Sequence, residues 1–174
     1  MKRHDLNPIL AAGDVPYPAT LVFNAGVCKW RGKYVMLFRN DFGSTEAQWR
    51  EAAAKNLPWP GFSTMIGVAT TDDFERFEIL SLSAPDNRNM VLFPEKIGGR
   101  YARLERPMPV YSRYGGPERF DIWLSESSDL RFWGETRLVL RGADVTWAGG
   151  KIGPAAPPVR TPRWTASSAA RRCQ

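Results

Sequence analysis

The stretch GKYVMLFR at residues 32–39 returns without a gap as GRYARLER at residues 99–106, and this repeat decides the fold. In each copy the glycine suits a hairpin turn, and a strand that begins at tyrosine alternates behind it. A lysine also stands three residues before the glycine in both copies, at Lys29 and Lys96. The chain therefore carries the same hairpin twice.

A second motif follows each hairpin. IGVATTDDFERF at residues 66–77 matches IWLSESSDLRFW at residues 122–133. In both, a strand ends in a turn rich in Ser, Thr and Asp, and an aromatic residue then fixes the next strand. The two motifs alternate along the chain, and a repeat of roughly 50 to 60 residues built from short strands is typical of β-propeller blades.

Pattern and turn residues predict eight strands and one short helix. The strands are expected at about 21–30, 33–39, 65–70, 76–80, 90–93, 101–105, 120–125 and 137–140. The helix is expected near 45–56, where a Ser-Thr pair precedes a run of Ala, Glu and Lys type, and the sequence LPWPG at residues 57–61 ends it. The helix and the LPWPG segment form a linker within the first repeat that contains no strand.

Composition favours an all-β domain. The chain has 174 residues, 12% aromatic residues, 15 glycines and 14 prolines, which fits many short strands and frequent chain reversals. Its two cysteines, Cys28 and Cys173, form no CxxC pair and imply no disulfide framework. With no signal-peptide pattern at the first residues and no apolar run of about 18 residues, we expect a cytoplasmic protein without a membrane partner.

The net charge of +6 does not indicate nucleic-acid binding. Four of the basic residues, Arg160, Arg163, Arg171 and Arg172, lie in the last stretch of the chain, which contains no acid. The rest of the chain is close to neutral, whereas a nucleic-acid groove needs basic and aromatic residues concentrated on one face. We therefore expect no nucleic-acid partner.

The segment from residue 86 to 109, DNRNMVLFPEKIGGRYARLERPMP, carries charges that a core does not need. A strand rich in Val, Leu and Phe closes on Pro-Glu-Lys, which is expected only where the charges face a cleft. Further sequence signposts accompany it, namely NPIL (7–10), FNAG (23–26), FRND (38–41), LFPEK (92–96), Arg106-Pro107, IWLS (122–125), Trp133-Gly134 and KIG (151–153).

Taken in this order, these signposts resemble glycoside hydrolase family 130, the β-mannoside phosphorylases and hydrolases, over residues 5 to about 161. The resemblance implies a five-bladed β-propeller that cleaves β-mannosidic bonds with inversion. It implies a β-mannoside oligosaccharide as substrate and no cofactor, with inorganic phosphate as co-substrate if the enzyme is a phosphorylase.

The chain departs from the family pattern in two places. It contains no Asp-Pro-Arg, the motif that carries the general acid of the family, and the helical linker at 44–62 stands where that motif belongs. Beyond Thr161 the family pattern stops. We therefore predict an incomplete five-bladed propeller, with parts of about three blades in residues 1–161 and a disordered non-family tail at 162–174. Exposed blade edges would permit self-association.

The resemblance also suggests which residues form the site. Substrate- or phosphate-binding roles are expected for Asn24, Arg39, Asp41, Arg88, Lys96, Arg106, Asp121 and Lys151. The repeat places Arg39 and Arg106 at the same position of successive blades. Ordinary structural roles remain open for each of these residues: ion pairs at strand ends for the charged ones and a turn position for Asn24. No metal-ligand spacing and no triad is present.

Reaction type depends on Glu105. Phosphorylases of the family usually carry histidine there, and a carboxylate repels phosphate and can activate water instead. Glu105 is thus the candidate base, with the general acid missing, which favours a hydrolase over a phosphorylase. The alternative is a catalytically inactive propeller remnant that at most binds sugar weakly.

Overall fold

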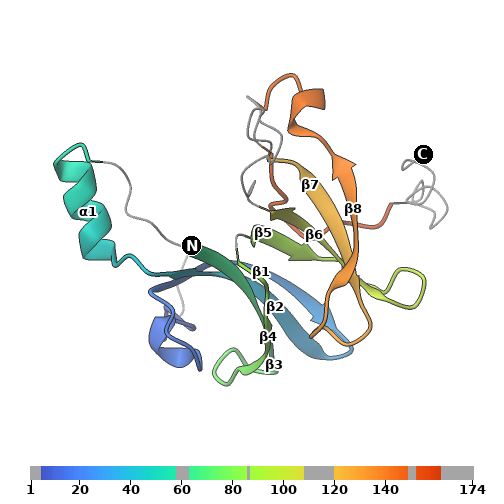
Figure 1. Ribbon diagram of the computed structural model, residues 1–174. Coiled ribbons are helices and arrows are strands. Elements are labelled where there is room, and N and C mark those ends of the chain that lie inside the picture. Colours follow the sequence, from blue (N-terminus) through green and yellow to red (C-terminus); the bar gives the residue numbers. More distant parts are fainter. Residues whose placement is uncertain (1–4, 58–62, 86, 108–119, 149–151, 162–174) are drawn as a thin grey trace.

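The computed structural model describes residues 5–57, 63–85, 87–107, 120–148 and 152–161, and its strands form two four-stranded antiparallel sheets (Figure 1). Each sheet is a meander, in the order β1-β2-β3-β4 and β5-β6-β7-β8. The strands are β1 (Leu21–Trp30), β2 (Lys33–Phe42), β3 (Ser63–Thr71), β4 (Glu78–Leu82), β5 (Asn87–Leu92), β6 (Tyr101–Pro107), β7 (Ile122–Ser127) and β8 (Gly134–Leu140). All eight lie close to the positions that the sequence predicts.

Strand pairing confirms the repeat at the level of register. Arg39 on β2 pairs with Phe23 on β1, and Arg106 on β6 pairs with Arg88 on β5. Two positions earlier, Leu37 pairs with Gly26 and Leu104 pairs with Val91. The two sheets are therefore built from equivalent hairpins.

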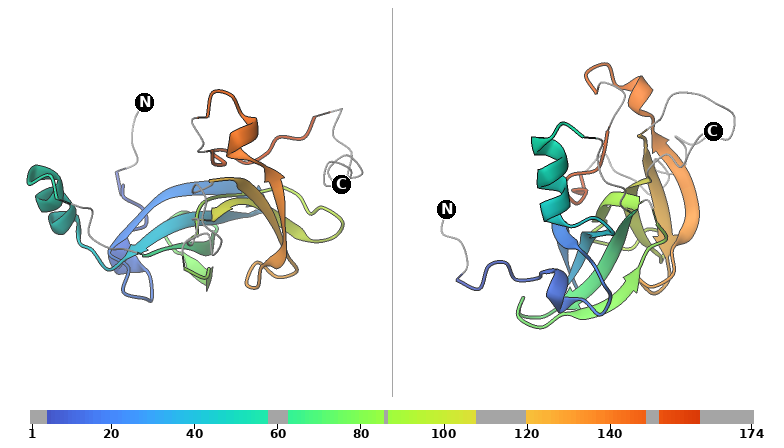
Figure 2. Two further views of the ribbon diagram at one scale, coloured as in Figure 1. Left: turned by 45° about the horizontal axis from the view of Figure 1, so that its top comes forward. Right: turned by 60° about the vertical axis from the view of Figure 1, so that its left-hand side comes forward.

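One hydrophobic core lies between the two sheets. Val35, Leu37, Ile66 and Val68 from the first sheet pack with Met90 and Leu92 from β5, and Trp30, Tyr101 and Trp133 close its margins. Burial of apolar area is the main force holding such layers together. Figure 2 shows the two sheets packed against each other in both orientations.

Polar contacts also join the sheets. The Ser81 hydroxyl on β4 donates to the Leu130 carbonyl at 3.0 Å, and Nη1 of Arg131 donates to the Leu80 carbonyl at 2.9 Å. Arg131 also pairs with Glu78 at 3.5 Å. The outer strand of the first sheet is thus bonded to the turn that follows β7.

The far face of the first sheet is covered by the N-terminal segment. Leu10 and Val15, which flank the short 3-10 helix η1 (Ala12–Asp14), pack against Met36, Phe38 and Ala69. Tyr17 joins this cluster, and its hydroxyl donates to Oδ1 of Asn40 at 3.2 Å. Both faces of the first sheet are therefore buried.

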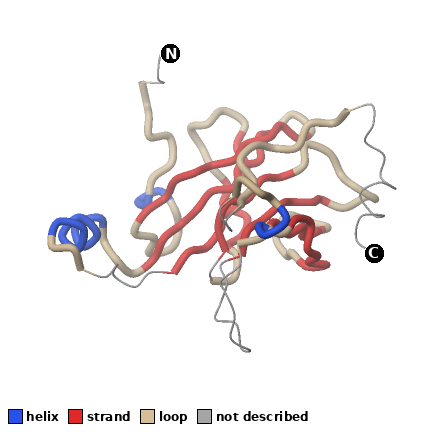
Figure 3. The backbone as a smooth tube through the Cα atoms, turned by 90° about the horizontal axis from the view of Figure 1, so that it is seen from above, coloured by secondary structure: helices blue, strands red, loops and turns tan. Residues whose placement is uncertain are grey.

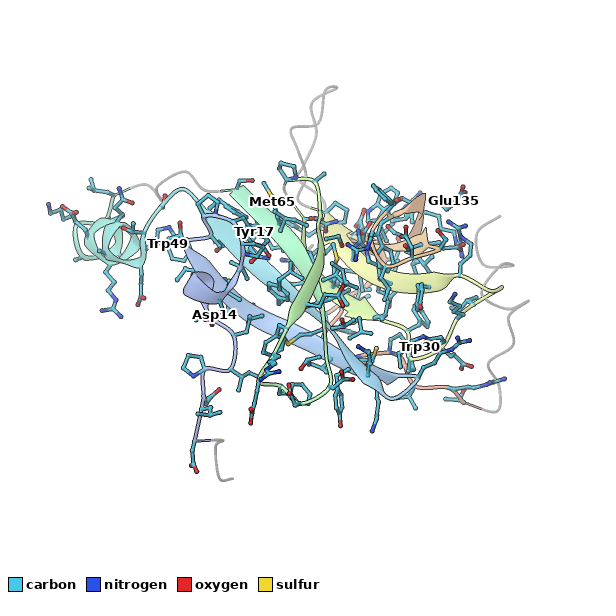
Figure 4. All side chains as sticks on the ribbon, turned by 90° about the horizontal axis from the view of Figure 1, so that it is seen from below. Asp14, Tyr17, Trp30, Trp49, Met65 and Glu135 are labelled. Carbon is cyan, nitrogen blue, oxygen red and sulfur yellow. The ribbon has the colours of Figure 1, made fainter. Side chains whose placement is uncertain are left out.

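Helix α1 (Glu46–Ala54) lies apart from the sheets (Figure 3). Thr45 caps it by accepting from the backbone of Gln48, whose side chain in turn accepts from the Thr45 backbone at 2.8 Å. This capping box begins the helix where the sequence predicts it. Figure 4 shows Trp49 on the side of α1 that faces the rest of the molecule.

The turns of the second motif are built alike in the two sheets. The hydroxyl of Thr71 accepts from the backbone of Phe74, and that of Ser127 accepts from the backbone of Leu130, both at 2.9 Å. Asp73 and Asp129 each accept two further backbone N–H groups. These bonds stabilise the charged form and lower the pKa of both carboxyl groups.

The depressed pKa of Asp129 predicts a pH-dependent contribution to stability. A carboxyl group whose pKa is lower in the folded state stabilises above its unfolded value and loses that contribution as the pH falls through the folded value. The free-energy difference between wild type and Asp129→Asn should therefore be largest above about pH 5 and shrink below about pH 4. Urea unfolding at a series of pH values measures it.

Ser128→Ala, one residue earlier in the same turn, is the control for that measurement. It leaves the carboxylate and its hydrogen bonds in place, so its difference from wild type should not vary with pH. A difference for Asp129→Asn that stays constant down to low pH would contradict the assignment.

The predicted number of blades is only partly tested. The described residues form two complete four-stranded sheets, whereas the sequence predicted parts of about three blades, and the number five stays a prediction. The predicted disorder of 162–174 lies outside the described residues, and self-association through the sheet edges stays a prediction. No helix of the described part of the chain is long and apolar enough to cross a membrane.

Candidate sugar- and anion-binding site

The first strand of each sheet, β1 and β5, contains a β-bulge at the same position. Register shifts between Phe23 and Gly26 in β1, and between Arg88 and Val91 in β5. The first residue of each bulge is an asparagine in the left-handed conformation, with φ of 53° at Asn24 and 57° at Asn89. Asparagine tolerates this conformation better than most residues, and a bulge redirects the side chains around it.

A pocket lies where the two bulges meet. It has a volume of about 300 Å³ and is open to solvent. Asn24, Gly26 and Asn89 contribute to its wall from the two sheets, and Pro154 and Ala155 close it from the C-terminal segment. The repeat thus brings two equivalent side-chain amides to one cavity, where amides can donate to and accept from sugar hydroxyls.

Arg106 is buried close to the pocket residue Asn89: a β-carbon built on Gly153 would lie 3.2 Å from Nη1 of Arg106 and 3.0 Å from Nδ2 of Asn89. Its guanidinium stands over the Phe120 ring at 5.6 Å, and its Nε has no hydrogen-bond partner among the described residues. Burial lowers the pKa of Arg106, and the positive charge of Arg39 lowers it further. Arg39 from the first sheet therefore lies close enough to act on the buried guanidinium of Arg106, and Arg88 is the register neighbour of Arg106 across the β5–β6 pair.

Arg39 is paired with a buried acid. Its Nε and Nη2 donate to the two carboxylate oxygens of Asp41 at 2.6 and 2.7 Å, and its guanidinium covers the Phe23 ring at 4.6 Å. Asp41 is fully buried. Asp41 thus pairs with Arg39, whose positive charge still acts on Arg106.

Glu105 occupies a different environment. Its carboxylate accepts from Asn87 Nδ2 at 3.0 Å, from Arg103 Nε at 2.9 Å and from the Ser125 hydroxyl, and it pairs with Nη2 of Arg103 at 2.8 Å. Successive strand residues point to opposite faces of a sheet, so Glu105 and Arg106 face opposite sides of β6. The oxygens of Glu105 are engaged in a buried network, and its predicted role as a base toward substrate stays a prediction.

Lys96 is not brought to the pocket either. It lies beyond the end of β5, in the connection to β6, and its ammonium sits over the Tyr101 ring at 4.3 Å. Lys29 makes the equivalent contact with Tyr34 at 5.2 Å. The repeated lysine is thus explained by a repeated cation–π contact at the hairpin.

Asp121 and Lys151 complete the set of predicted site residues. Asp121 is buried, and its Oδ1 accepts from the Gly142 backbone at 2.8 Å, which fixes the short 3-10 helix η2 (Gly142–Asp144). Lys151 lies outside the described residues. The binding roles predicted for both stay predictions.

Sequence reasoning favoured Arg88 over its neighbour Asn89 and did not single out Gly153. Asn89 is the counterpart of Asn24 in the second hairpin, but the ungapped sequence match does not align the two asparagines. The ungapped hairpin match does not extend into the first strands, because Val27 pairs with Met36 while Leu92 pairs with Arg103. The stretch between these paired residues is therefore two residues longer in the β5–β6 hairpin than in the β1–β2 hairpin. Asn24 and Asn89 consequently do not align when the two hairpins are compared without a gap.

The gathered groups define what the site can do. Side-chain amides and arginine guanidinium groups can bind hydroxyls and an oxyanion, and the neighbouring apolar walls can hold a sugar ring. In the described part of the chain, no group of three His, Cys, Asp or Glu side chains is placed to hold a metal ion.

Curated relatives of the chain share one activity. The β-1,4-mannooligosaccharide phosphorylase of Ruminococcus albus is 40% identical over 102 residues, which are 58% of this chain and 29% of that protein. The β-1,2-mannobiose phosphorylase of Listeria innocua is 35% identical over 101 residues, 58% of this chain and 27% of that protein. The chain thus spans less than a third of the length of these two relatives. No protein-family model matches it.

A solved structure supports the fold. The β-1,2-mannobiose phosphorylase of Listeria innocua in complex with β-1,2-mannobiose superposes with a TM-score of 0.50 at 19% identity, covering 92% of this chain and 72% of that chain. This likeness places the chain in the class of proteins with propeller-like antiparallel sheets. Over the matched residues the chain is similar to β-mannoside phosphorylases, in agreement with the resemblance of its motifs to glycoside hydrolase family 130.

Proposed function

We propose that this chain carries the phosphate- and mannoside-binding part of a β-mannoside phosphorylase. In this reading the pocket between Asn24 and Asn89 receives the sugar, and Arg106 with its neighbours Arg88 and Arg39 receives inorganic phosphate. The observation that carries the proposal is the buried Arg106 guanidinium, whose Nε lacks a hydrogen-bond partner among the described residues and which adjoins a polar pocket of about 300 Å³.

Phosphorolysis fits this site better than the hydrolysis that Glu105 suggested. Hydrolysis with inversion needs a free carboxylate to activate water on the face opposite the leaving group. Glu105 is held by Arg103, Ser125 and Asn87 on the other side of β6. A phosphate held by arginines can itself attack the anomeric carbon, so that no such base is required.

The proposed reaction is an inverting displacement. A phosphate oxygen forms a bond to the anomeric carbon of the mannosyl unit while the bond to the glycosidic oxygen breaks, and the leaving oxygen takes a proton from an acid. This sequence has no Asp-Pro-Arg motif to supply that acid. The chain by itself is therefore proposed to bind phosphate and mannoside and to release little or no mannose 1-phosphate.

Replacement of Arg106 by glutamine should weaken the binding of inorganic phosphate by roughly 10- to 100-fold, since a hydrogen bond to a charged group contributes about 1.5–3 kcal/mol. Isothermal titration calorimetry of the wild-type chain and the variant with phosphate measures this. The control is Arg50→Gln on helix α1, which changes the net charge equally at an exposed ion pair with Glu46. It should leave phosphate binding within about twofold of wild type.

Two outcomes would overturn the proposal. If the wild-type chain binds neither phosphate nor a β-linked mannobiose, the inactive remnant is the correct description. Equal loss of phosphate affinity in Arg50→Gln and Arg106→Gln would mean that only the net charge of the chain attracts phosphate.

A further inference from the structure

Gly153 lies against the side chains of both Asn89 and Arg106. A β-carbon built on Gly153 would lie 3.0 Å from Nδ2 of Asn89, 3.2 Å from Nη1 of Arg106 and 3.5 Å from its Cδ. The first two distances are shorter than the usual contact of a methyl group. The Asn89 amide and the Arg106 guanidinium thus both occupy space that any other residue at position 153 would fill.

The backbone around Gly153 is held in place independently of these side chains. The preceding residue, Ile152, is buried, and its backbone N–H donates to the Phe120 carbonyl at 3.1 Å. Phe120 also supplies the ring under the Arg106 guanidinium. Pro154 and Ala155 then continue along the pocket wall. A β-carbon at position 153 would therefore be accommodated by moving the ends of Asn89 and Arg106.

We infer that Gly153 is a positioning residue for both ligands of the proposed site. Its missing side chain lets the C-terminal segment press against Asn89 and Arg106, so that the amide and the guanidinium are set side by side at the pocket. The inference rests on the proposed function, because it assigns Gly153 to the same phosphate and mannoside site. It adds that the affinities for the two ligands are coupled through one backbone position.

A β-carbon at position 153 would shift the ends of Asn89 and Arg106 by a few tenths of an ångström, and such a shift is enough to weaken ligand binding. The planar fork of an arginine binds an oxyanion only in a narrow range of orientations, so a displaced guanidinium forms weaker hydrogen bonds. Gly153→Ala should therefore weaken the binding of inorganic phosphate and of β-1,2-mannobiose each by roughly three- to tenfold, the usual effect of impairing one hydrogen bond. The loss should appear in both titrations.

The test compares wild type, Gly153→Ala and Gly13→Ala by calorimetric titration with the two ligands. Gly13→Ala is the matched control, because a β-carbon there meets no atom within 4 Å. Urea unfolding of each variant shows whether it is folded. A side-chain NMR spectrum that covers the Asn89 amide and the Arg106 Nε–H provides a readout that does not need a ligand.

The inference is supported if Gly153→Ala shifts both side-chain signals and weakens both ligands while Gly13→Ala does neither. A double-mutant cycle sharpens it, since Gly153→Ala should cost less phosphate affinity in an Arg106→Lys background, where the fork that meets the β-carbon is gone. The inference is wrong if wild type binds phosphate and Gly153→Ala binds it equally well. If wild type binds neither ligand, the proposed function fails first, and the inference with it.

Discussion

Replacement of Glu105 by glutamine is expected to lower the free energy of unfolding by about 3–5 kcal/mol, the usual cost of leaving one partner of a buried ion pair uncompensated. The side chains of Arg103 and Glu105 are only 5% and 4% exposed, so solvent screens neither charge. The Arg103 guanidinium also stacks on the Trp133 ring at 4.1 Å, inside the packing between the sheets. Burial lowers the pKa of Arg103 to about 10, against the opposing effect of Glu105.

Glutamine keeps the size of the side chain but removes the charge. It also brings an NH₂ group into a site where Asn87, Arg103 and Ser125 all donate to the present carboxylate. Urea unfolding at neutral pH measures the loss. Glu51→Gln is the control, since it breaks an exposed pair with Lys55 on helix α1 and should cost about 0.5 kcal/mol or less.

The same variant separates two roles of Glu105. A structural role predicts a large loss of stability, with phosphate binding retained by the molecules that remain folded. If Glu105→Gln keeps wild-type stability but abolishes sugar cleavage in a catalytically competent relative of this chain, Glu105 acts on substrate and our structural assignment is wrong.

Gly67→Ala is the second substitution for which we expect a large effect, a loss of about 2–3 kcal/mol in the free energy of unfolding. Gly67 on β3 lies directly opposite Phe38 on β2, and the aromatic ring covers it. A β-carbon at Gly67 would lie 2.6 Å from Cε2 of Phe38 and 2.9 Å from the Tyr17 hydroxyl. Neither group can retreat without opening the cluster under the N-terminal segment.

Two variants test the cause of that loss. Gly134→Ala places a β-carbon in strand β8 where no atom lies within 4 Å, and its stability should stay close to wild type. Phe38→Leu combined with Gly67→Ala should cost less than the sum of the single changes, because the smaller side chain leaves room for the methyl group. Strict additivity would show that the Phe38 ring is not what excludes a side chain at Gly67.

Several site residues could be predicted from the sequence because they belong to the repeat. Arg39 and Arg106 do occupy the same register position of successive hairpins, and Asn24, expected to bind substrate or phosphate, lines the pocket. Lys96 also repeats, and both repeated lysines contact a tyrosine ring at the hairpin end, while the binding role of Lys96 stays a prediction. A repeated charge thus indicates an equivalent environment, but it does not say whether that environment is a site.

The sequence by itself determined the strands, the capped helix and the equivalence of the two hairpins, because turn residues, capping residues and strand patterns act over short distances along the chain. Only the tertiary structure decided which face of β6 each charge takes, so that Arg106 adjoins the pocket while its neighbour Glu105 is buried with Arg103 between the sheets. It also decided that Gly153 meets Asn89 and Arg106. Such contacts join residues far apart in sequence, and their geometry depends on how the sheets and the C-terminal segment pack.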